Sequence, residues 1–285
     1  MKIVETISAI REEVRKLKAE GRSIGLVPTM GFLHEGHLSL IEAARAKHDV
    51  VVVSIFVNPL QFGPNEDFER YPRDLDRDER LARNSGVDIL FCPPVEEMYP
   101  GETAMTIHVT KGVDVLCGAS RPGHFDGVAT VVMKLFQLTA PDEAFFGQKD
   151  AQQVAVIINM VRTFNVPVNI VSCPTVREED GLAKSSRNVY LTEQERQEAS
   201  FLYQALRKAA ERAQAGEHDR ERLLQYLTGL LEGGSGTIDY VEALSYPALE
   251  RQEKLGGRII LAVAYHYTKA RLIDNIIIEL DREEA

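Results

Sequence analysis

Short apolar runs rich in β-branched residues alternate with segments of helical periodicity over the first 175 residues. The apolar runs lie at residues 24–29, 49–57, 87–92, 143–146 and 168–173. Runs of this length are typical of strands buried on both faces of a parallel sheet. Apolar side chains recur at helical spacing over residues 5–20, 38–48, 73–85, 127–139 and 150–164. This alternation predicts an α/β domain with a doubly wound parallel sheet.

The pattern changes after about residue 175. Thr192 and Glu195 form a T-x-x-E capping box, which predicts a long helix from there to about residue 215. A second helix is expected over about 219–231, followed by strands at 238–244, 258–267 and 270–279. The last two strands are separated by a short polar turn, which indicates an antiparallel hairpin. We therefore expect two domains, residues 1–175 and a smaller α+β domain over residues 176–285.

Composition and charge narrow the class of protein. The formal net charge of -10 argues against non-specific nucleic-acid binding, which needs a basic surface. Cys92, Cys117 and Cys173 are far apart and have no CxxC spacing, so a reducing compartment is expected rather than a disulfide framework. The N-terminal segment is charged throughout and is unlike a signal peptide, and no apolar run approaches the roughly 18 residues of a membrane span. These features predict a cytoplasmic protein that does not bind membranes.

The stretch PTMGFLHEGHLSL, residues 28–40, joins a predicted strand to a predicted helix. Its turn contains Gly31, His34, Gly36 and His37. Glycines allow a ligand to approach the backbone, and the N–H groups at a helix start attract phosphate. Histidines at that place can donate hydrogen bonds to phosphoryl oxygens. The alternatives are two surface histidines or a metal site, for which the sequence supplies no further histidine or cysteine motif.

Two later segments carry cations suited to polyphosphate. In FFGQKDAQQ, Lys149, Asp150 and Gln153 share one face at a predicted helix entrance, where a lysine can pair with phosphate and an aspartate can hold Mg²⁺ through water. In GLAKSSRN, residues 184–187 combine two cations with two hydroxyls, and arginine can bind phosphate through two hydrogen bonds. The alternatives are a solvated helix start and a polar domain linker.

Polar residues also follow the second predicted strand. Asn58 and Gln61 lie just past its end, where amides can orient a small substrate. Asp74, Asp76 and Asp78 come next, and we interpret most of these charges as a solvated helix face; the alternative is that one of them contacts a metal or the substrate. The segment RPGHFDGV, residues 121–128, opens a further helix and either lines the same site or forms a loop.

With these motifs in view, the chain resembles the pantoate–β-alanine ligase (pantothenate synthetase) family, within the nucleotidyltransferases that carry the HIGH signature. The matching segments run almost from end to end and include PTMGFLHEGH, SIFVNPLQFGPNED, YPRDL, RPGHFDGVATVV, FFGQKDAQQ, TVREEDGLAKSSRN and RLIDNI. The resemblance implies a Rossmann-like N-terminal domain that binds ATP and pantoate and a C-terminal lid domain. It also implies ligation of pantoate and β-alanine through a pantoyl adenylate, with release of pyrophosphate and AMP.

The resemblance also implies roles for individual residues. Catalytic roles fall to His34, His37, Lys149 and Arg187, and His37 is the family's proton donor. The ATP-binding residues are Met30, Gly31, Phe32, Leu33, His34, Glu35, Gly36, His37, Gly147, Gln148, Lys149, Asp150, Val176, Lys184, Ser185, Ser186 and Arg187. Gln61 and Gln153 bind pantoate, Gln61 borders the β-alanine site, and Asp150 lies near Mg²⁺. Because pantoate is already ionised at pH 7, we expect His37 to stabilise phosphate charge rather than to move a proton in the first step.

Three further points stay open at the level of sequence. Lys184 departs from the methionine that is common in the family at this position, and it either adds phosphate affinity or points to solvent. The resemblance implies a homodimer formed through the N-terminal domain. The alternatives in function are another nucleotidyltransferase of the same superfamily and, from a different class, a zinc-binding module built on His34 and His37.

Overall fold

The chain divides into two compact units in a computed structural model that describes residues 1–64, 66 and 68–281. The first unit comprises Met1–Thr110, Arg121–Gln148 and Val156–Pro174. The second comprises Lys111–Ser120, Lys149–Ala155 and Thr175–Ala285. Two short segments from the first 175 residues thus belong to the second unit, which the expected domain boundary did not include.

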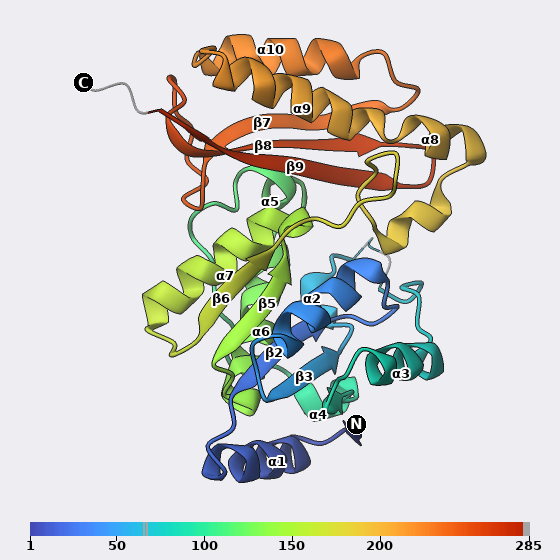
Figure 1. Ribbon diagram of the computed structural model, residues 1–285, viewed down its shortest axis with the longest axis vertical. Helices are drawn as coiled ribbons and strands as arrows, with labels where there is room; N and C mark the ends of the chain where they lie inside the picture. Colours follow the sequence, from blue (N-terminus) through green and yellow to red (C-terminus); the bar gives the residue numbers. More distant parts are fainter. Residues whose placement is uncertain (65, 67, 282–285) are drawn as a thin grey trace. The chain divides into compact units, whose positions relative to one another are not determined.

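The first unit contains a six-stranded parallel sheet in the order β1-β4-β3-β2-β5-β6 (Figure 1). Its strands are β1 (Lys2–Val4), β2 (Ile24–Thr29), β3 (Val50–Ile55), β4 (Ile89–Phe91), β5 (Glu143–Gly147) and β6 (Asn169–Cys173). Apart from β1, which lies at the edge beyond β4, the strand order moves outward from β2 in both directions, as in doubly wound sheets. The predicted parallel α/β sheet is confirmed. The strand β1 was not predicted, since three residues are too few to show a periodicity.

Helices flank this sheet, with α2 in front of it and α6 behind it in Figure 1. The helices of the first unit are α1 (Ile7–Ala19), α2 (Glu35–Arg45), α3 (Leu75–Asn84), α4 (Val95–Met98), α6 (His124–Thr139) and the later part of α7 (Ala151–Phe164). Val27 and Val53 of neighbouring strands are fully buried in one cluster with Ile41 and Ala44 of α2. Such burial of aliphatic side chains supplies the main favourable free energy of folding.

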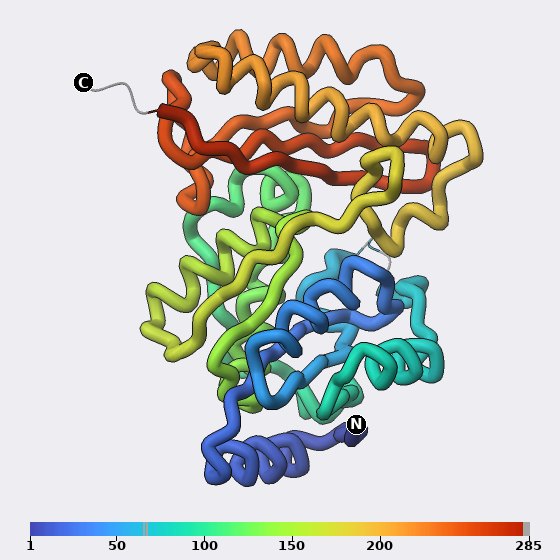
Figure 2. The backbone as a smooth tube through the Cα atoms, in the orientation of Figure 1, coloured from blue at the N-terminus to red at the C-terminus, as the bar shows by residue number. Residues whose placement is uncertain are grey.

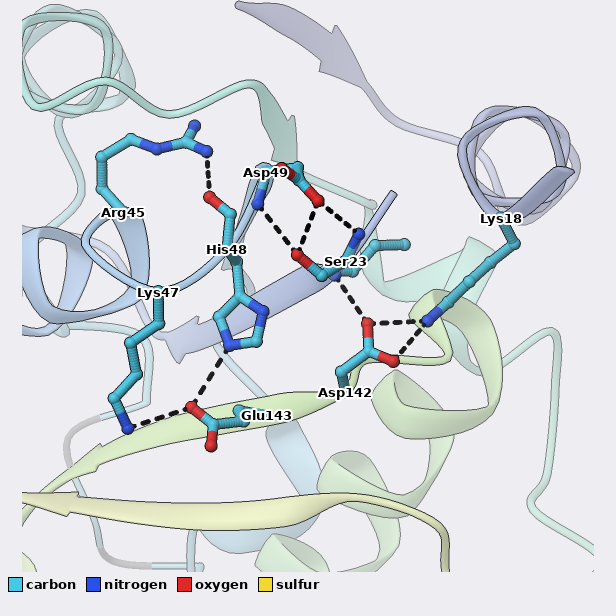
Figure 3. Close-up of polar contacts among 9 residues, drawn as sticks. Lys18, Ser23, Arg45, Lys47, His48, Asp49, Asp142 and Glu143 are labelled. Atoms are coloured by element: carbon cyan, nitrogen blue, oxygen red, sulfur yellow. Dashed lines mark hydrogen bonds and ion pairs between the residues drawn. The ribbon is translucent and has the colours of Figure 1, made fainter. Parts of the chain in front are cut away.

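The amino ends of β2, β3 and β5 are joined by side-chain hydrogen bonds (Figure 3). The Asp49 carboxylate accepts from the backbone N–H of Ser23 at 2.9 Å and from its hydroxyl at 2.8 Å, and these bonds lower the pKa of Asp49. Asp142 accepts from the N–H of Ile24 at 2.7 Å and pairs with Lys18 at 2.8 Å. These contacts hold the strands together at their amino ends. Ligands of α/β sheets bind at the other end, outside the carboxyl ends of the strands.

The second unit is built on the antiparallel sheet β7-β8-β9. Its strands are β7 (Thr237–Ser245), β8 (Gly257–His266) and β9 (Arg271–Leu280). Its helices are α5 (Leu116–Ser120), the start of α7, α8 (Glu193–Glu198), α9 (Phe201–Gln214) and α10 (Arg220–Leu231). Figure 2 traces β8 and β9 as the predicted antiparallel hairpin, which is confirmed.

Both faces of β8 are covered, which explains its unbroken apolar sequence. Leu261 and Val263 pack in a cluster with residues of α9 and α10. Ile260 and Ala262 point to the other face, where they pack with Leu116 and Ala151, among others. The segments Lys111–Ser120 and Lys149–Ala155 therefore belong to the second unit because they bury this second face.

One helix prediction was wrong. The helix expected from Thr192 to about residue 215 is interrupted, with α8 ending at Glu198 and α9 beginning at Phe201. Ala199 and Ser200 between them are buried and keep right-handed helical dihedral angles. The apolar periodicity thus continues across the break, so the sequence pattern did not reveal it. No helix among the described residues combines the length and the apolar character that a membrane crossing requires.

The predicted capping box at Thr192 is present and gives the second unit a pH-dependent contact. The Glu195 carboxylate accepts from the N–H of Thr192 at 2.8 Å and from the N–H of Thr268, in the β8–β9 turn, at 2.9 Å. These backbone hydrogen bonds lower the pKa of Glu195 from its ordinary value of 4.5 to about 2. The stabilisation is therefore complete above pH 4.5 and is lost as the pH falls toward 2.

We predict that Glu195→Gln removes this part of the acid sensitivity. The variant should be less stable than the parent protein at neutral pH, and the difference should shrink between pH 4.5 and the acid limit of folding. Urea unfolding midpoints at a series of pH values measure the effect. Glu193→Gln, an exposed residue of the same helix, is the control and should leave the pH profile unchanged. A constant difference at all pH values would contradict the prediction.

Candidate active site

The turn that follows β2 is held by a buried carboxylate. Gly31 and Phe32 have positive φ angles of 82° and 51°, a conformation that is costly for phenylalanine. Asp78 of α3 accepts from the N–H groups of Phe32 and Leu33, each at 2.7 Å. Burial raises the pKa of Asp78, while the two N–H groups act in the opposite direction. The expectation that most of the three aspartates lie on a solvated face agrees with the exposed N-cap Asp74 and the exposed Asp76, whereas Asp78 is buried and points inward.

His34 and His37 together cap the N-terminus of α2. His34 Nδ1 accepts from the N–H of Gly36 at 3.1 Å, and His37 Nδ1 accepts from the N–H of His34 at 3.2 Å. A neutral imidazole whose Nδ1 accepts carries its proton on Nε2, so each ring presents Nε2–H as a donor. The ring centroids are 4.1 Å apart. A Cβ at position 36 would lie 2.9 Å from a ring carbon of His34, which explains the glycine between the histidines.

Gln61 lies buried in the short 3₁₀ helix η1 (Pro59–Gln61), beyond the end of β3. Its Nε2 is 2.9 Å from the sulfur of Met30, in the turn after β2. Its Oε1 accepts from Asn58 Nδ2 at 3.2 Å, and Asn58 also donates to the carbonyl of Gly127 at 3.0 Å. The structure thus brings together Met30 and Gln61, which were predicted from separate motifs. Asn58 has a supporting role, since it holds the Gln61 amide and the helix α6.

The segment 121–128 supports Gln61 from its backbone side. Arg121 forms two hydrogen bonds to the Glu66 carboxylate, one of 2.7 Å, and donates to His124 Nε2 at 3.0 Å. His124 Nδ1 therefore carries the proton and donates to the carbonyl of Gln61 at 2.7 Å. These contacts place the segment directly against the backbone of Gln61, as expected if it lines the same site rather than forming only a loop.

The predicted Lys149 segment begins where β5 ends. Gly147 is the last residue of that strand, and Gln148, Lys149 and Asp150 form the 3₁₀ helix η2 before α7. Gly147 and Gln148 belong to the first unit, whereas Lys149 and Asp150 belong to the second. The Lys149 ammonium is 3.7 Å from the carboxylate of Asp150, which is half-exposed. Lys149 and Asp150 thus pair at the helix entrance at which the sequence placed them.

Residues 176–184 form a small hairpin in the second unit. Lys184 donates its backbone N–H to the carbonyl of Val176 at 2.9 Å, so two predicted ATP-binding residues are paired directly. Inside the hairpin, Arg177 forms a two-pronged ion pair with Asp274 of β9, at 2.6 and 2.9 Å, and stacks 3.5 Å from the ring centre of Tyr203. The hairpin is therefore fastened to regular elements.

Lys184, which stands where methionine was expected from the resemblance, forms an ion pair within this hairpin. Its ammonium lies 3.1 Å from the carboxylate of Glu178. The chain then enters the 3₁₀ helix η3 (Ser186–Tyr190), whose N-cap Ser185 accepts from the N–H of Arg187 at 3.3 Å. Asn188 donates to the carbonyl of Ala183 at 3.0 Å. A short turn therefore carries Ser185, Ser186 and Arg187, and a hydrogen bond connects this turn to the hairpin.

Two adjacent glutamines of α7 differ in their contacts. Gln152 is buried, donates to the carbonyls of Gly112 and Val115 at 2.9 and 2.8 Å, and accepts from Gly118. Gln153, the residue predicted to bind pantoate, is partly exposed. Burial and hydrogen bonding thus assign a structural role to Gln152, about which the sequence made no prediction.

Several residues that support the candidate site were not predicted, namely Asp78, Arg177, Asp274 and Asn275. Arg177 and Asp274 stood inside quoted motifs, TVREEDG and RLIDNI, but a motif does not show which residues pair. Over residues 1–64, 66 and 68–281, no group of three or more His, Cys, Asp or Glu side chains has an arrangement that could hold a metal ion.

The chain is similar to known proteins over nearly its whole length. Residues 2–277 match the family model described as Pantoate-beta-alanine ligase. The pantothenate synthetase of Bacillus subtilis (strain 168) is 58% identical over 284 residues, covering 100% of this chain and 99% of that protein. The crystal structure of the Thermus thermophilus pantothenate synthetase superposes with a TM-score of 0.91 at 45% identity, covering 97% of this chain and 99% of that chain.

A third relative was solved with ligands. The pantoate–β-alanine ligase of Francisella tularensis, described as complexed with beta-gamma ATP and β-alanine, has a TM-score of 0.78 and 37% identity, with 97% of each chain covered.

We predict that Asp78→Asn destabilises the protein by about 1–3 kcal/mol, because one backbone N–H then faces an amide donor instead of an acceptor. Activity should fall more than about tenfold, since the turn before His34 loses its support. Urea unfolding and steady-state assays measure the two effects. Asp76→Asn is the matched control on the exposed side of the same helix. Equal behaviour of the two variants would show that Asp78 does not hold the turn.

Proposed function

The chain belongs to the pantoate–β-alanine ligase family and is an enzyme that forms pantothenate, and we propose that it does so through a pantoyl adenylate. The pantoate carboxylate attacks the α-phosphate of ATP and displaces pyrophosphate. The amine of β-alanine then attacks the activated carbonyl, AMP leaves, and the amine proton is lost. Adenylation is needed because a free carboxylate is a poor acyl donor.

The observation that carries this proposal is the pair of histidine caps at the start of α2. Both Nδ1 atoms accept backbone hydrogen bonds, so both Nε2–H groups are donors at the positive end of a helix. Donors at a helix N-terminus suit the phosphates of ATP and the charge that develops on them. Phosphate binding thus explains the turn better than surface histidines do.

The same caps bear on the role of His37. An imidazolium has no acceptor nitrogen, so protonating His37 would break its hydrogen bond from the His34 N–H. We therefore infer that His37 stabilises phosphate charge as a neutral donor and does not act as the proton donor of the first step. His34 acts in the same way through its own Nε2–H.

Cationic residues are also expected to bind the phosphates of ATP. We propose that Lys149 pairs with phosphate and that Arg187 binds the departing pyrophosphate, with Ser185 and Ser186 as hydroxyl donors. Val176 contacts the adenine side, while Lys184 contributes less charge than its type suggests because Glu178 pairs with it. Asp150 would hold Mg²⁺ through water, and the bound ion would neutralise charge on the phosphates.

We propose that Gln61 and Gln153 bind pantoate and that Gln61 also borders the β-alanine site. The support lies in the fixed orientation of Gln61, whose carbonyl accepts from His124 and whose side chain contacts Met30 and Asn58. A preorganised amide of this kind orients a small polar substrate at little entropic cost. A homodimer stays a prediction from the family resemblance, and a cytoplasmic location stays a prediction from the cysteine pattern and the hydropathy of the sequence.

We predict that the protein exchanges labelled pyrophosphate into ATP when pantoate is present, without β-alanine, because the adenylate step is reversible. AMP should accumulate only after β-alanine is added. This dependence distinguishes the ligase from a nucleotidyltransferase of the same superfamily that leaves its nucleotide on the product. Failure of pantoate to support exchange would overturn the adenylate route.

In the same assay, Lys149→Ala should slow exchange by about 10²–10³-fold, because a charge contact to the transition state is lost. Lys208→Ala, an exposed lysine of α9, is the matched control and should leave exchange unchanged. Near-normal exchange by the Lys149 variant would remove Lys149 from the phosphate site.

We predict that Gln153→Ala and Gln61→Ala raise the KM for pantoate by about 10- to 100-fold, as expected for hydrogen bonds to a charged ligand, and raise the KM for ATP much less. Gln152→Ala should instead lower the unfolding midpoint, because its three backbone contacts are structural. Equal changes in both KM values would argue against a pantoate pocket at these glutamines.

A further inference from the structure

Two consecutive buried polar residues stand out on β9, an edge strand of the second unit's sheet. Asp274 is 5% exposed and Asn275 is 7% exposed. Successive residues of a strand point to opposite faces of the sheet. Asp274 pairs across the sheet with Val263, whose side chain packs toward α9 and α10. Asn275 pairs with Ala262, whose side chain lies on the other face, toward α5 and the start of α7.

On the first face, Asp274 anchors the hairpin of residues 176–184 (Figure 1, yellow segment beside β9). Both carboxylate oxygens accept from Arg177, at 2.6 and 2.9 Å. Arg177 also donates to the carbonyl of Gly181 at 3.1 Å and forms an antiparallel bridge with Ala183. The guanidinium therefore ties both arms of the hairpin to one carboxylate, directly before the loop that begins at Lys184.

On the second face, Asn275 anchors the other cationic segment. Its Nδ2 donates to the backbone carbonyl of Lys149 at 2.9 Å. The N–H of Asn275 donates to Asp274 Oδ1 at 2.8 Å, so the two anchors are also joined to each other. The carbonyl of Lys149 lies in the 3₁₀ helix η2, where its position determines the direction in which the lysine side chain leaves the backbone.

We propose that Asp274 and Asn275 are positioning residues that hold the Lys149 segment and the Lys184–Arg187 loop in one fixed arrangement. This inference rests on the proposed function of those two segments in binding the phosphates of ATP. A charge contact stabilises a transition state only when its distance is fixed beforehand. One strand that fastens both segments fixes the distance between their cations before ATP arrives.

The test uses two variants that keep the shape of the side chain. Asn275→Asp removes the donor to the Lys149 carbonyl, and Asp274→Asn removes the charge that holds Arg177. Each should slow pantoate-dependent pyrophosphate exchange by about 10- to 100-fold, as misplaced catalytic groups do. The KM for pantoate should stay close to that of the parent protein. Glu279→Gln, at an exposed position of the same strand, is the control and should behave as the parent protein.

A double-mutant cycle separates positioning from general stability. Because Asn275 acts through Lys149, its effect on exchange should disappear in a Lys149→Ala background. Thermal unfolding of every variant, with assays run well below the lowest midpoint, shows that folded protein is compared. An additive effect in the double variant, or normal exchange by Asn275→Asp and Asp274→Asn, would overturn the inference.

The outcomes also distinguish this inference from the proposed function. If the parent protein shows no pantoate-dependent exchange, or if Lys149→Ala exchanges normally, the proposed function of the segments fails. If both behave as predicted while the β9 variants exchange normally, the proposed function stands and only the positioning role is wrong.

Discussion

Two hydrogen bonds to the buried Asp78 carboxylate determine the geometry on which the histidine pair depends. They hold the N–H groups of Phe32 and Leu33 in a turn where Phe32 has an unfavourable left-handed conformation. His34 follows at once as the N-cap of α2, and its own N–H fixes the tautomer of His37. A carboxylate on α3 thus holds the turn that leads directly into the histidine caps of another helix.

The second unit uses the same physical device with different residues. The Lys149 turn and the hairpin of residues 176–184 are irregular, so part of their backbone must find partners outside helices and strands. Arg177 and Asn275 supply partners from side chains that are themselves fixed on or against the strand β9. In both units, regular elements hold the irregular segments that present chemical groups.

Helices and strands were predictable where the sequence pattern is local. The residues that hold the candidate site in place were not predictable in this way. Apolar runs and helical periodicity identified most strands and helices, because burial imposes those patterns on each element separately. Asp78 could not be told from Asp76, since a polar helix shows the same composition whether one carboxylate points inward or all point to solvent.

Membership of the second unit also depends on distant contacts. The segment Lys111–Ser120 belongs there because it covers a face of β8, which lies far later in the chain. The residues proposed to contact substrate were found through motifs, because a motif contains the residue types that the reaction requires. The residues that hold them in place, such as Asp78 and Asp274, act through contacts with residues distant in the sequence, and a motif does not show those contacts.

The polar contacts at the amino ends of β2, β3 and β5 have a consequence for how such a sheet can change in evolution. Ser23 and Asp49 bond to each other, and Asp142 accepts from the N–H of Ile24, so these strand starts are joined without contacts from the loops at the carboxyl ends of the strands. Substitutions that alter those loops therefore leave the strand register intact. Natural selection can therefore change the substrate specificity through the loops at the carboxyl ends of the strands, while the contacts at the amino ends preserve the fold.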